Sequence, residues 1–216
     1  MRLFALLLLA AIPAVACAGG SNYGVTPGAL PSLAGKVSEW PVPTPRFARD
    51  PAIAPDGSVY VAVMNGNKVA RFDPQTTRFT EWDLPAGHRP HGLLVDRNGI
   101  VWTTGNGNGT IGKLDPATGK MVEYKMPVAF AEPYDIWPDH DNNMWIADGA
   151  MGGAIIKFDQ TTEKFTFYPA VQRGDLPKLE ITREGGVWYN PRSAIKGAVG
   201  VLYPDMSKMT TYEARY

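Results

Sequence analysis

The chain has 216 residues, which gives room for one domain or a small array of repeats. Its 21 Lys and Arg residues balance 21 Asp and Glu residues, so there is no basic excess to attract a phosphate backbone, and we expect no nucleic-acid partner. Glycine (23), proline (19) and aromatic residues (11%) are frequent, which favours short strands and tight turns over helices.

The start of the chain is predicted to be a signal peptide covering residues 1–16. Arg2 precedes an apolar run at residues 3–12 that is too short to span a bilayer well as a mature helix. The small residues of the sequence AVAC, which ends at Cys17, fit ordinary signal-peptidase cleavage. The same four residues resemble a bacterial lipobox, in which the cysteine becomes the lipidated N-terminus. Both alternatives predict export, either to the periplasm or to the outer membrane as a lipoprotein.

Cys17 is the only cysteine of the chain, so it can form no internal disulfide, which agrees with lipidation at this position. We expect the protein to contact a membrane only through this lipid anchor. Residues 17–35 are rich in Gly, Ser, Ala and Pro and are predicted to be a flexible tether. The folded part is predicted over residues 36–216, beginning with an isolated strand at residues 37–42 (VSEWPV).

Aromatic residues and prolines recur along the folded part with a period of about 43 residues. One aromatic series has spacings of 42, 42, 44 and 44 residues, a second has 42, 43 and 43, and a proline series has 39, 43 and 44. Three independent series that keep step indicate an internal repeat. Their members are Trp40, Trp82, Tyr124, Tyr168 and Tyr212; Tyr60, Trp102, Trp145 and Trp188; and Pro51, Pro90, Pro133 and Pro177.

The second unit shows that one repeat contains four short strands. Residues 91–96 (HGLLVD) form an apolar strand, and the Asn-Gly pair that follows is favoured in two-residue hairpins, because both positions take positive φ at low cost. Strands at residues 100–104 and 110–115 flank the turn GNGNG, and residues 121–126 (MVEYKM) form the fourth strand. Four short strands in about 43 residues are typical of a propeller blade, so the chain is predicted to be an all-β β-propeller.

About four four-stranded blades are predicted, with the recurring Trp residues packed between them. Closure of the propeller stays open, because the strand at residues 37–42 is one more than four blades need, and the fourth unit already ends in its own strand, MTTYEA. A compact four-bladed ring, an open arc, and a larger ring closed by dimerisation are the alternatives. An open arc would leave an apolar blade face uncovered, which favours association or aggregation, and a homodimer is one such state.

The units follow the pattern Pro-x-x-Ile, an Asp/Asn-Gly turn, V-W-x-T, a Gly/Asn turn, I-G-R/K-x-D and an E-Y/W-x-x-P strand. Residues 99–127 (GIVWTTGNGNGTIGKLDPATGKMVEYKMP) give this pattern closely, and it resembles the streptogramin B (virginiamycin B) lyase family over about residues 37–216. Members of that family usually have about seven blades, whereas this chain has about four. The resemblance implies a metal-assisted elimination. A Mg²⁺ ion polarises the substrate, a His removes a proton α to a carbonyl, and the ester of a cyclic depsipeptide opens without water.

Two of the family's motifs match particular residues of this chain. The motif R-P-H, whose His contacts the substrate, falls on Arg89 and His91, and the resemblance implies substrate binding by both. The motif E-P-H-G supplies a metal carboxylate and the catalytic base, with a second acid three residues after the Trp of the next strand. It places the carboxylates for Mg²⁺ at Glu132 and Asp148. Tyr134 stands where the family has its catalytic His.

Tyrosine is a poorer base than histidine, because its reference pKa is about 10 and that of histidine is about 6.5. Three alternatives follow. His91 is the base in a rearranged site, Tyr134 is a weak base or acid for different chemistry, or the site binds a ligand and does not react. The other two histidines, His88 and His140, lie in predicted turns, and we expect both to be solvated.

The repeat predicts a cluster at the same positions without the resemblance, because the first residues of the inner strands line one end of a propeller's channel. Two carboxylates suit Mg²⁺, which keeps several of its waters. Simpler roles are open too: a hydrogen bond at the strand end for His91, an ion pair between Glu132 and Arg89, and a turn position for Asp148. The expected cluster consists of Arg89, His91, Glu132, Tyr134, Asp148 and Lys178.

The sequence therefore predicts an exported, streptogramin-lyase-like propeller that acts on a small-molecule ligand and opens an ester-linked ring. The alternative is a non-catalytic periplasmic propeller that binds a ligand or a partner. A lactonase-like metal hydrolase is a third candidate, and it would require at least about three protein ligands for its metal ion.

Overall fold

The structure is a computed structural model that describes residues 38–150, 152–171, 174–192, 197–204 and 208–213. One compact unit begins at Trp40 and contains all the strands. The predicted signal peptide, Cys17 and the tether at residues 17–35 lie outside the described residues. Within the described part of the chain, no helix has the length and apolar character needed to cross a membrane.

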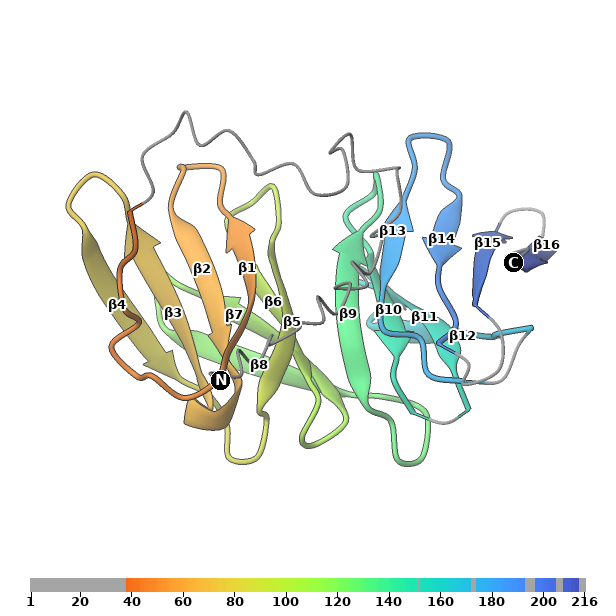
Figure 1. The fold of residues 1–216 in the computed structure, drawn as a ribbon, viewed down its shortest axis with the longest axis horizontal. Helices are drawn as coiled ribbons and strands as arrows, with labels where there is room; N and C mark the ends of the chain where they lie inside the picture. Colours follow the sequence, from red (N-terminus) through yellow and green to blue (C-terminus); the bar gives the residue numbers. More distant parts are fainter. Residues whose placement is uncertain (1–37, 151, 172–173, 193–196, 205–207, 214–216) are drawn as a thin grey trace, which may run out of the picture. The chain divides into compact units, whose positions relative to one another are not determined.

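The strands form four antiparallel four-stranded sheets, each built from four strands that are consecutive in the sequence (Figure 1). We number these sheets as blades 1 to 4 in chain order. Blade 1 contains β1 (Ala48–Ile53), β2 (Val59–Val63), β3 (Lys68–Asp73) and β4 (Arg78–Asp83), with a 3-10 turn η2 (Met64–Gly66); blade 2 contains β5 (Pro90–Val95), β6 (Val101–Gly105), β7 (Thr110–Asp115) and β8 (Lys120–Lys125). Blade 3 contains β9 (Pro133–Pro138), β10 (Met144–Asp148), β11 (Ala154–Asp159) and β12 (Lys164–Pro169); blade 4 contains β13 (Leu179–Ile181), β14 (Val187–Tyr189), β15 (Ala198–Tyr203) and β16 (Lys208–Glu213).

The prediction of an all-β propeller with about four four-stranded blades is confirmed. The turn after the first strand of each blade carries a residue with positive φ, between 67° and 82°, at the positions that the sequence marks with Gly or Asn. These conformations are cheap for glycine and tolerated by asparagine, so the hairpin forms locally in every unit. The residues are Gly57, Gly99, Asn142 and Gly185.

The two aromatic series keep step because their members stack on one another inside each blade. Trp102 on β6 lies 6.4 Å from Tyr124 on β8, centroid to centroid, and the ring pairs of the other three blades lie at 5.6 to 6.4 Å. At most 2% of the surface of Trp102 and of Trp145 is exposed, and both lie in apolar clusters between blades, as predicted, whereas Trp188 of blade 4 is half-buried. The period of the sequence is thus the period of the packing.

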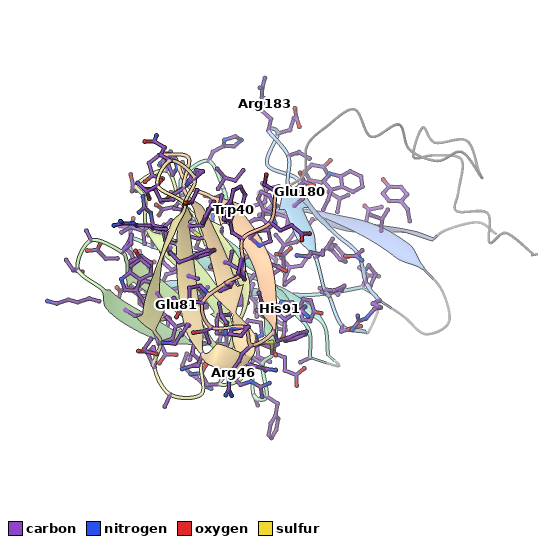
Figure 2. All side chains as sticks on the ribbon, turned by 60° about the vertical axis from the view of Figure 1, so that its left-hand side comes forward. Trp40, Arg46, Glu81, His91, Glu180 and Arg183 are labelled. Carbon is purple, nitrogen blue, oxygen red and sulfur yellow. The ribbon has the colours of Figure 1, made fainter. Side chains whose placement is uncertain are left out.

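The strand predicted at residues 37–42 is wrong for its described part, residues 38–42, which form no strand. Trp40 instead packs onto Phe72, with ring centroids 4.9 Å apart. The backbone N–H and the hydroxyl of Thr44 donate to the carboxylate of Glu81 at 3.0 and 2.7 Å. The segment thus binds blade 1 through side chains of that blade and does not form the backbone hydrogen bonds of a β-strand. In Figure 2 the labelled Trp40, Glu81 and Arg46 follow one another along blade 1.

The innermost strands β1, β5, β9 and β13 lie next to one another in that order (Figure 1). Three buried clusters fill the spaces between successive blades. Ile111 and Ile155 are fully buried on the faces that blades 2 and 3 turn to the next blade, whereas Val199, at the same place in blade 4, is 41% exposed. The four described blades therefore form an open set. Closure by dimerisation stays a prediction.

Candidate functional site

Three inner strands carry a bulge at their first residues, and these bulges set the site. The β1–β2 register shifts between Ala48 and Pro51, so that two residues of β1, Arg49 and Asp50, stand opposite one residue of β2. The same happens at His91 in β5, between Pro90 and Leu93, and at Tyr134 in β9. A bulge bends its strand and changes the direction of the side chains there. Blades 1, 2 and 3 thus direct Arg49, His91 and Tyr134 to one place.

His91 is almost fully buried, with 3% of its surface exposed. Its Nδ1 lies 3.0 Å from the backbone oxygen of Tyr134, so Nδ1–H donates there, and the lone pair of Nε2 accepts from Nη2 of Arg49. The rings of His91 and Tyr134 are 3.6 Å apart, centroid to centroid. Burial and the positive charge of Arg49 lower the pKa of His91 to about 4. The imidazole is therefore neutral at pH 7, which is the form that accepts a proton.

Gly92 allows β5 to approach β9 this closely. A Cβ at this position would lie 2.6 Å from the backbone oxygen of Tyr134 and 3.1 Å from Oγ1 of Thr104. Thr104 Oγ1 accepts from the N–H of Gly92 at 2.7 Å and lies 3.2 Å from the same Tyr134 oxygen, to which it donates. His91 and Gly92 thus act together at the contact between β5 and β9: the histidine hydrogen-bonds to β9, and the glycine leaves room for the two strands to approach.

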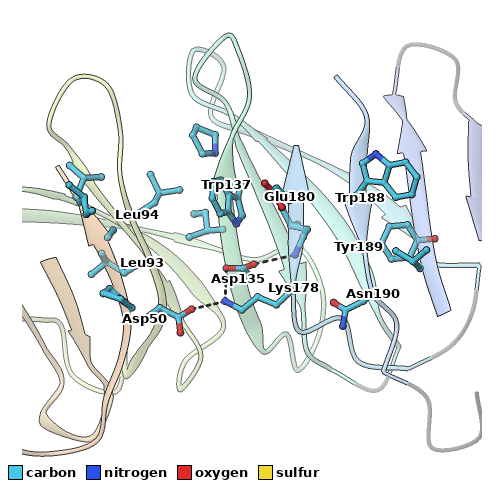
Figure 3. Close-up of a pocket in the computed structure, with 18 residues that line it drawn as sticks. Asp50, Leu93, Leu94, Asp135, Trp137, Lys178, Glu180, Trp188, Tyr189 and Asn190 are labelled. Atoms are coloured by element: carbon cyan, nitrogen blue, oxygen red, sulfur yellow. Dashed lines mark hydrogen bonds and ion pairs between the residues drawn. The ribbon is translucent and has the colours of Figure 1, made fainter. Parts of the chain in front are cut away.

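Lys178, the residue before β13, connects three blades through ion pairs (Figure 3). Its Nζ lies 2.9 Å from Oδ2 of Asp50 in blade 1 and 3.3 Å from Oδ1 of Asp135 in blade 3. Burial raises the pKa of Asp135, whose Oδ2 also accepts from the N–H of Leu179 at 3.1 Å. Burial acts to lower the pKa of Lys178, but the two carboxylates outweigh it, and the pKa is raised. The expected polar cluster therefore contains His91, Tyr134 and Lys178.

A cavity of about 820 Å³ begins at Asp50 and Lys178 and extends along the inner strands of all four blades (Figure 3). Its walls beyond the ion pairs are mainly apolar, which suits a small-molecule ligand with an apolar body. The walls include Ile53, Leu93, Leu94, Trp137, Trp188 and Val199.

Arg89, predicted to contact substrate, makes its hydrogen bonds away from His91. Its φ is 49°, its backbone N–H donates to Oδ1 of Asn67 at 2.8 Å, and its Nη2 donates to Oδ1 of Asn65 at 3.1 Å. Its side chain is exposed. The structure therefore places Arg89 against the loop of blade 1, and its substrate contact stays a prediction.

The predicted metal carboxylates are held differently from each other. Asp148 is 1% exposed, and its Oδ1 accepts from the backbone N–H groups of Glu132 and Ala150 at 2.9 and 3.2 Å. Burial raises the pKa of Asp148, and Glu132 is exposed. Among the described residues, no group of three or more His, Cys, Asp and Glu side chains is placed to hold a metal ion. This pair offers a cation at most an exposed carboxylate and one remaining oxygen, so the fit to Mg²⁺ is weak, and the metal site stays a prediction.

Sequence reasoning missed Arg49 and Asp135. Asp50 stands before the repeat proline of β1, as Glu132 and Arg89 do before theirs, so the neighbouring Arg49 could have been found from the alignment of the units. Nothing in the sequence indicated that Asp135 meets Lys178, because the two residues belong to different blades.

The expectation that His88 is solvated is wrong, since its side chain is fully buried. Its Nδ1 lies 2.8 Å from Oε1 of Glu123, and its Nε2 lies 2.8 Å from Oγ1 of Thr103. Burial lowers its pKa. His140 is exposed, as expected. The buried network around His88 fixes a loop of blade 2, and this explains a histidine in what reads as a turn.

Comparisons with known proteins agree with the propeller fold. A streptogramin B lyase structure is 23% identical over 76% of this chain and 54% of that chain, with a TM-score of 0.69. A virginiamycin B lyase from Staphylococcus aureus is 23% identical over 84% of this chain and 60% of that chain, with a TM-score of 0.74. A catalytically inactive form of that enzyme with quinupristin is 21% identical over the same shares, with a TM-score of 0.74.

The chain thus spans 54% to 60% of the length of these solved relatives, which share its fold. Comparison with curated proteins gives no significant match. The model of the virginiamycin B lyase family matches residues 29–200, which is most of the chain. The chain belongs to the virginiamycin B lyase family.

Proposed function

We propose that this protein is an exported lyase-like propeller that binds an ester-linked cyclic ligand in the channel and opens its ring by elimination. The observation that carries the proposal is the convergence of Arg49, His91 and Tyr134 from three bulged strands, whose following residues line a mainly apolar cavity. Such a pocket, with a few convergent polar groups and a perturbed histidine, is the usual form of a binding or active site. The family to which the chain belongs supports the reaction class.

In an elimination of this kind, a base takes the proton on the carbon α to a carbonyl. The carbon–oxygen bond to the ester then breaks, and the ester leaves as a carboxylate. His91 supports the role of base, because it is neutral and its Nδ1–H bond to the Tyr134 oxygen leaves the lone pair on Nε2. That lone pair accepts from Arg49, so Arg49 has to turn toward the substrate before His91 acts. The hydroxyl oxygen of Tyr134 accepts from Nη2 of Arg49 at 3.3 Å, and its own O–H would be the proton donor of the proposed reaction.

A magnesium ion held by Glu132 and Asp148 would polarise the substrate carbonyl as a Lewis acid. Export and lipidation at Cys17 belong to the same proposal, because an apolar run, small residues and a single cysteine stand in order at the start of the chain. If Cys17→Ser left the protein in the membrane fraction, the lipid anchor would be wrong.

The proposal is tested by incubating the purified protein with quinupristin, with and without added magnesium, and following the product by chromatography and mass spectrometry. Elimination opens the ring without changing the mass, whereas a hydrolase such as a lactonase adds one water. We expect a linear product of unchanged mass, and a rate at least about 100-fold lower in His91→Ala, as for loss of a general base.

His140→Ala is the matched control, because this histidine is exposed and its ring bonds to the backbone oxygen of Arg183 at 2.8 Å. Its backbone oxygen accepts from Arg97, a bond that alanine keeps. This variant should keep the wild-type rate. An unchanged rate in His91→Ala would show that His91 is not the base, and a product heavier by one water would replace the lyase by a hydrolase.

A non-catalytic binding propeller is the second candidate. Two observations favour it. Tyr134 stands in the place of the family's histidine, and Oδ1 of Asp148 already accepts from two backbone N–H groups, so it is less available to a metal ion. Binding of quinupristin without turnover, weakened by His91→Ala, would support this candidate over the enzyme.

A further inference from the structure

Arg49 is a partly buried cation whose hydrogen bonds and ring contacts go to neutral groups. Its Nη2 donates to Nε2 of His91 and lies 3.3 Å from the hydroxyl of Tyr134. Its guanidinium carbon lies 5.0 Å from the ring centroid of Phe47 and 5.9 Å from that of Tyr134. Among the described residues, no carboxylate lies within ion-pair distance of Arg49. A charge withdrawn from water without a counter-charge is costly, so this arrangement needs an explanation.

Two other cations at this end of the channel have carboxylate partners, whereas the exposed Arg89 donates to asparagine side chains. Lys178 pairs with Asp50 and Asp135. Arg192 pairs with Asp175, and its pKa is raised by that carboxylate and, to a smaller extent, by the hydroxyl of Tyr134. The carboxylates nearest to the site are therefore already used, and the guanidinium of Arg49 keeps an unmatched positive charge.

We propose that Arg49 is the anchor of a carboxylate-binding site, which takes small carboxylates whose apolar body extends into the cavity beyond Asp50. The guanidinium matches a carboxylate with two parallel N–H···O bonds, and its charge has no other partner. Asp50, the residue after Arg49, lines the cavity, whose apolar walls include Leu93 and Leu94 of blade 2 and Trp137 of blade 3. An anion therefore satisfies the charge, and its apolar part fills the space.

Occupation of this site also acts on His91. A carboxylate that binds Arg49 competes with Nε2 of His91 for the same donor, and it cancels part of the positive charge beside the imidazole. The base then gains a free lone pair. This last step rests on the proposed function: the ester that leaves in the elimination is itself a carboxylate, and Arg49 is where it would be held.

The test uses the purified full chain and three probes: benzoate, its neutral analogue benzamide, and acetate. Isothermal titration calorimetry should show that benzoate binds, that benzamide does not, and that acetate binds about tenfold more weakly because it buries little apolar surface. Arg49→Gln should weaken benzoate binding about tenfold or more, as expected for loss of hydrogen bonds to a charged group. The benzoate affinity of Arg49→Lys should lie between those of the wild type and Arg49→Gln, because lysine keeps the charge but lacks the paired N–H donors of a guanidinium.

Arg46→Gln is the matched control, since Arg46 is exposed and lies three residues before Arg49. It should bind benzoate as the wild type does. Equal binding of benzoate and benzamide, or an unchanged affinity in Arg49→Gln, overturns the proposal. So does a wild-type dissociation constant for benzoate weaker than about 10 mM.

A second measurement does not depend on a folded Arg49 variant. The titration of the His91 ring, followed by NMR in the wild type, should move to higher pH when benzoate is present, because the bound anion offsets the charge of Arg49. Benzamide should leave it in place. The other charged groups that face His91 are Asp50 and Lys178, which are paired with each other and should respond little.

The two proposals fail separately. Benzoate binding that depends on Arg49, without any turnover of quinupristin, leaves the anion site intact and removes the lyase. Turnover with an unchanged rate and unchanged benzoate affinity in Arg49→Gln keeps the lyase and removes the anion site.

Discussion

At the scale of single residues, the site depends on which protonation states burial imposes. His91 and His88 are both buried, and burial lowers the pKa of each. Both ring nitrogens of His88 are hydrogen-bonded, one to Glu123 and one to Thr103, which gives this residue a structural role. His91 uses one nitrogen to fix its ring and presents the other to Arg49. Two histidines of blade 2 thus differ in role, and the difference lies in the partner of the second ring nitrogen.

The lowered pKa of His91 predicts a loss of stability in acid. Its pKa is about 4 in the folded protein and about 6.5 in the unfolded chain, so the unfolded state binds more protons between these values. The free energy of unfolding should therefore decrease as the pH falls from about 6.5 to about 4, by up to about 3 kcal/mol from this group. His88 adds to the same trend. Burial of Asp135 and Asp148 acts in the opposite sense, because their raised pKa values reduce stability as the pH rises above 3.8.

Urea unfolding of the wild type, His91→Gln and His140→Gln across this pH range checks the prediction. His91→Gln should have a shallower pH dependence than the wild type, and His140→Gln should match the wild type. An identical slope in all three proteins would mean that His91 does not titrate between the folded and unfolded states.

At the scale of elements, the bulges of β1, β5 and β9 set the geometry of the candidate site. Without them, the side chains of each inner strand would alternate regularly between its two faces. With them, Arg49, His91 and Tyr134 leave that alternation at the same level of three neighbouring strands. β5 depends most on its bulge, because Gly92 brings it against the backbone of β9.

Gly92→Ala should therefore destabilise the protein by about 1–3 kcal/mol, as for overpacking of a tight contact. The added Cβ would lie 2.6 Å from the backbone oxygen of Tyr134, which cannot move without shifting β9. Gly152→Ala is the control, because a Cβ there meets nothing within 4 Å. Chemical denaturation measures both variants. Equal stability of the two variants would show that β5 and β9 separate at no cost.

At the scale of the molecule, the four described blades leave a face of blade 4 without a covering blade. Val199 is 41% exposed and Tyr212 is 53% exposed. At the equivalent positions of blades 2 and 3, Ile111 and Ile155 are fully buried, and Tyr124 and Tyr168 are half-buried. The first blade differs, because Trp40 covers Phe72 on its own outer face. The described chain thus has one protected end and one open apolar end, and an exposed apolar sheet face favours association.

We expect this chain to self-associate with rising concentration through blade 4. Light scattering should show a mass above that of the monomer, and Val199→Lys should reduce association by placing a charge on the contact. Val122→Lys is the control, because Val122 is 52% exposed on an outer strand of blade 2. A monomer at every concentration, or equal association in both variants, would contradict this prediction.

The sequence by itself determined the period, the four-stranded unit and the residues that fill the blades. These follow from local patterns: a Gly or Asn that takes positive φ at the first turn, and an aromatic pair that stacks within each blade. It also brought His91, Tyr134 and Lys178 to one end of the channel, because equivalent places in repeats converge when the repeats stack side by side.

Only the tertiary structure decided how these residues act. The bulges that place Arg49 beside His91, the ion pairs of Lys178 with Asp50 and Asp135, and the burial of His88 each join segments from different strands or blades. A sequence pattern records which residues alternate along one strand. The direction of a side chain at a bulge, and the charge state that burial imposes on it, depend on neighbours that are distant in the chain.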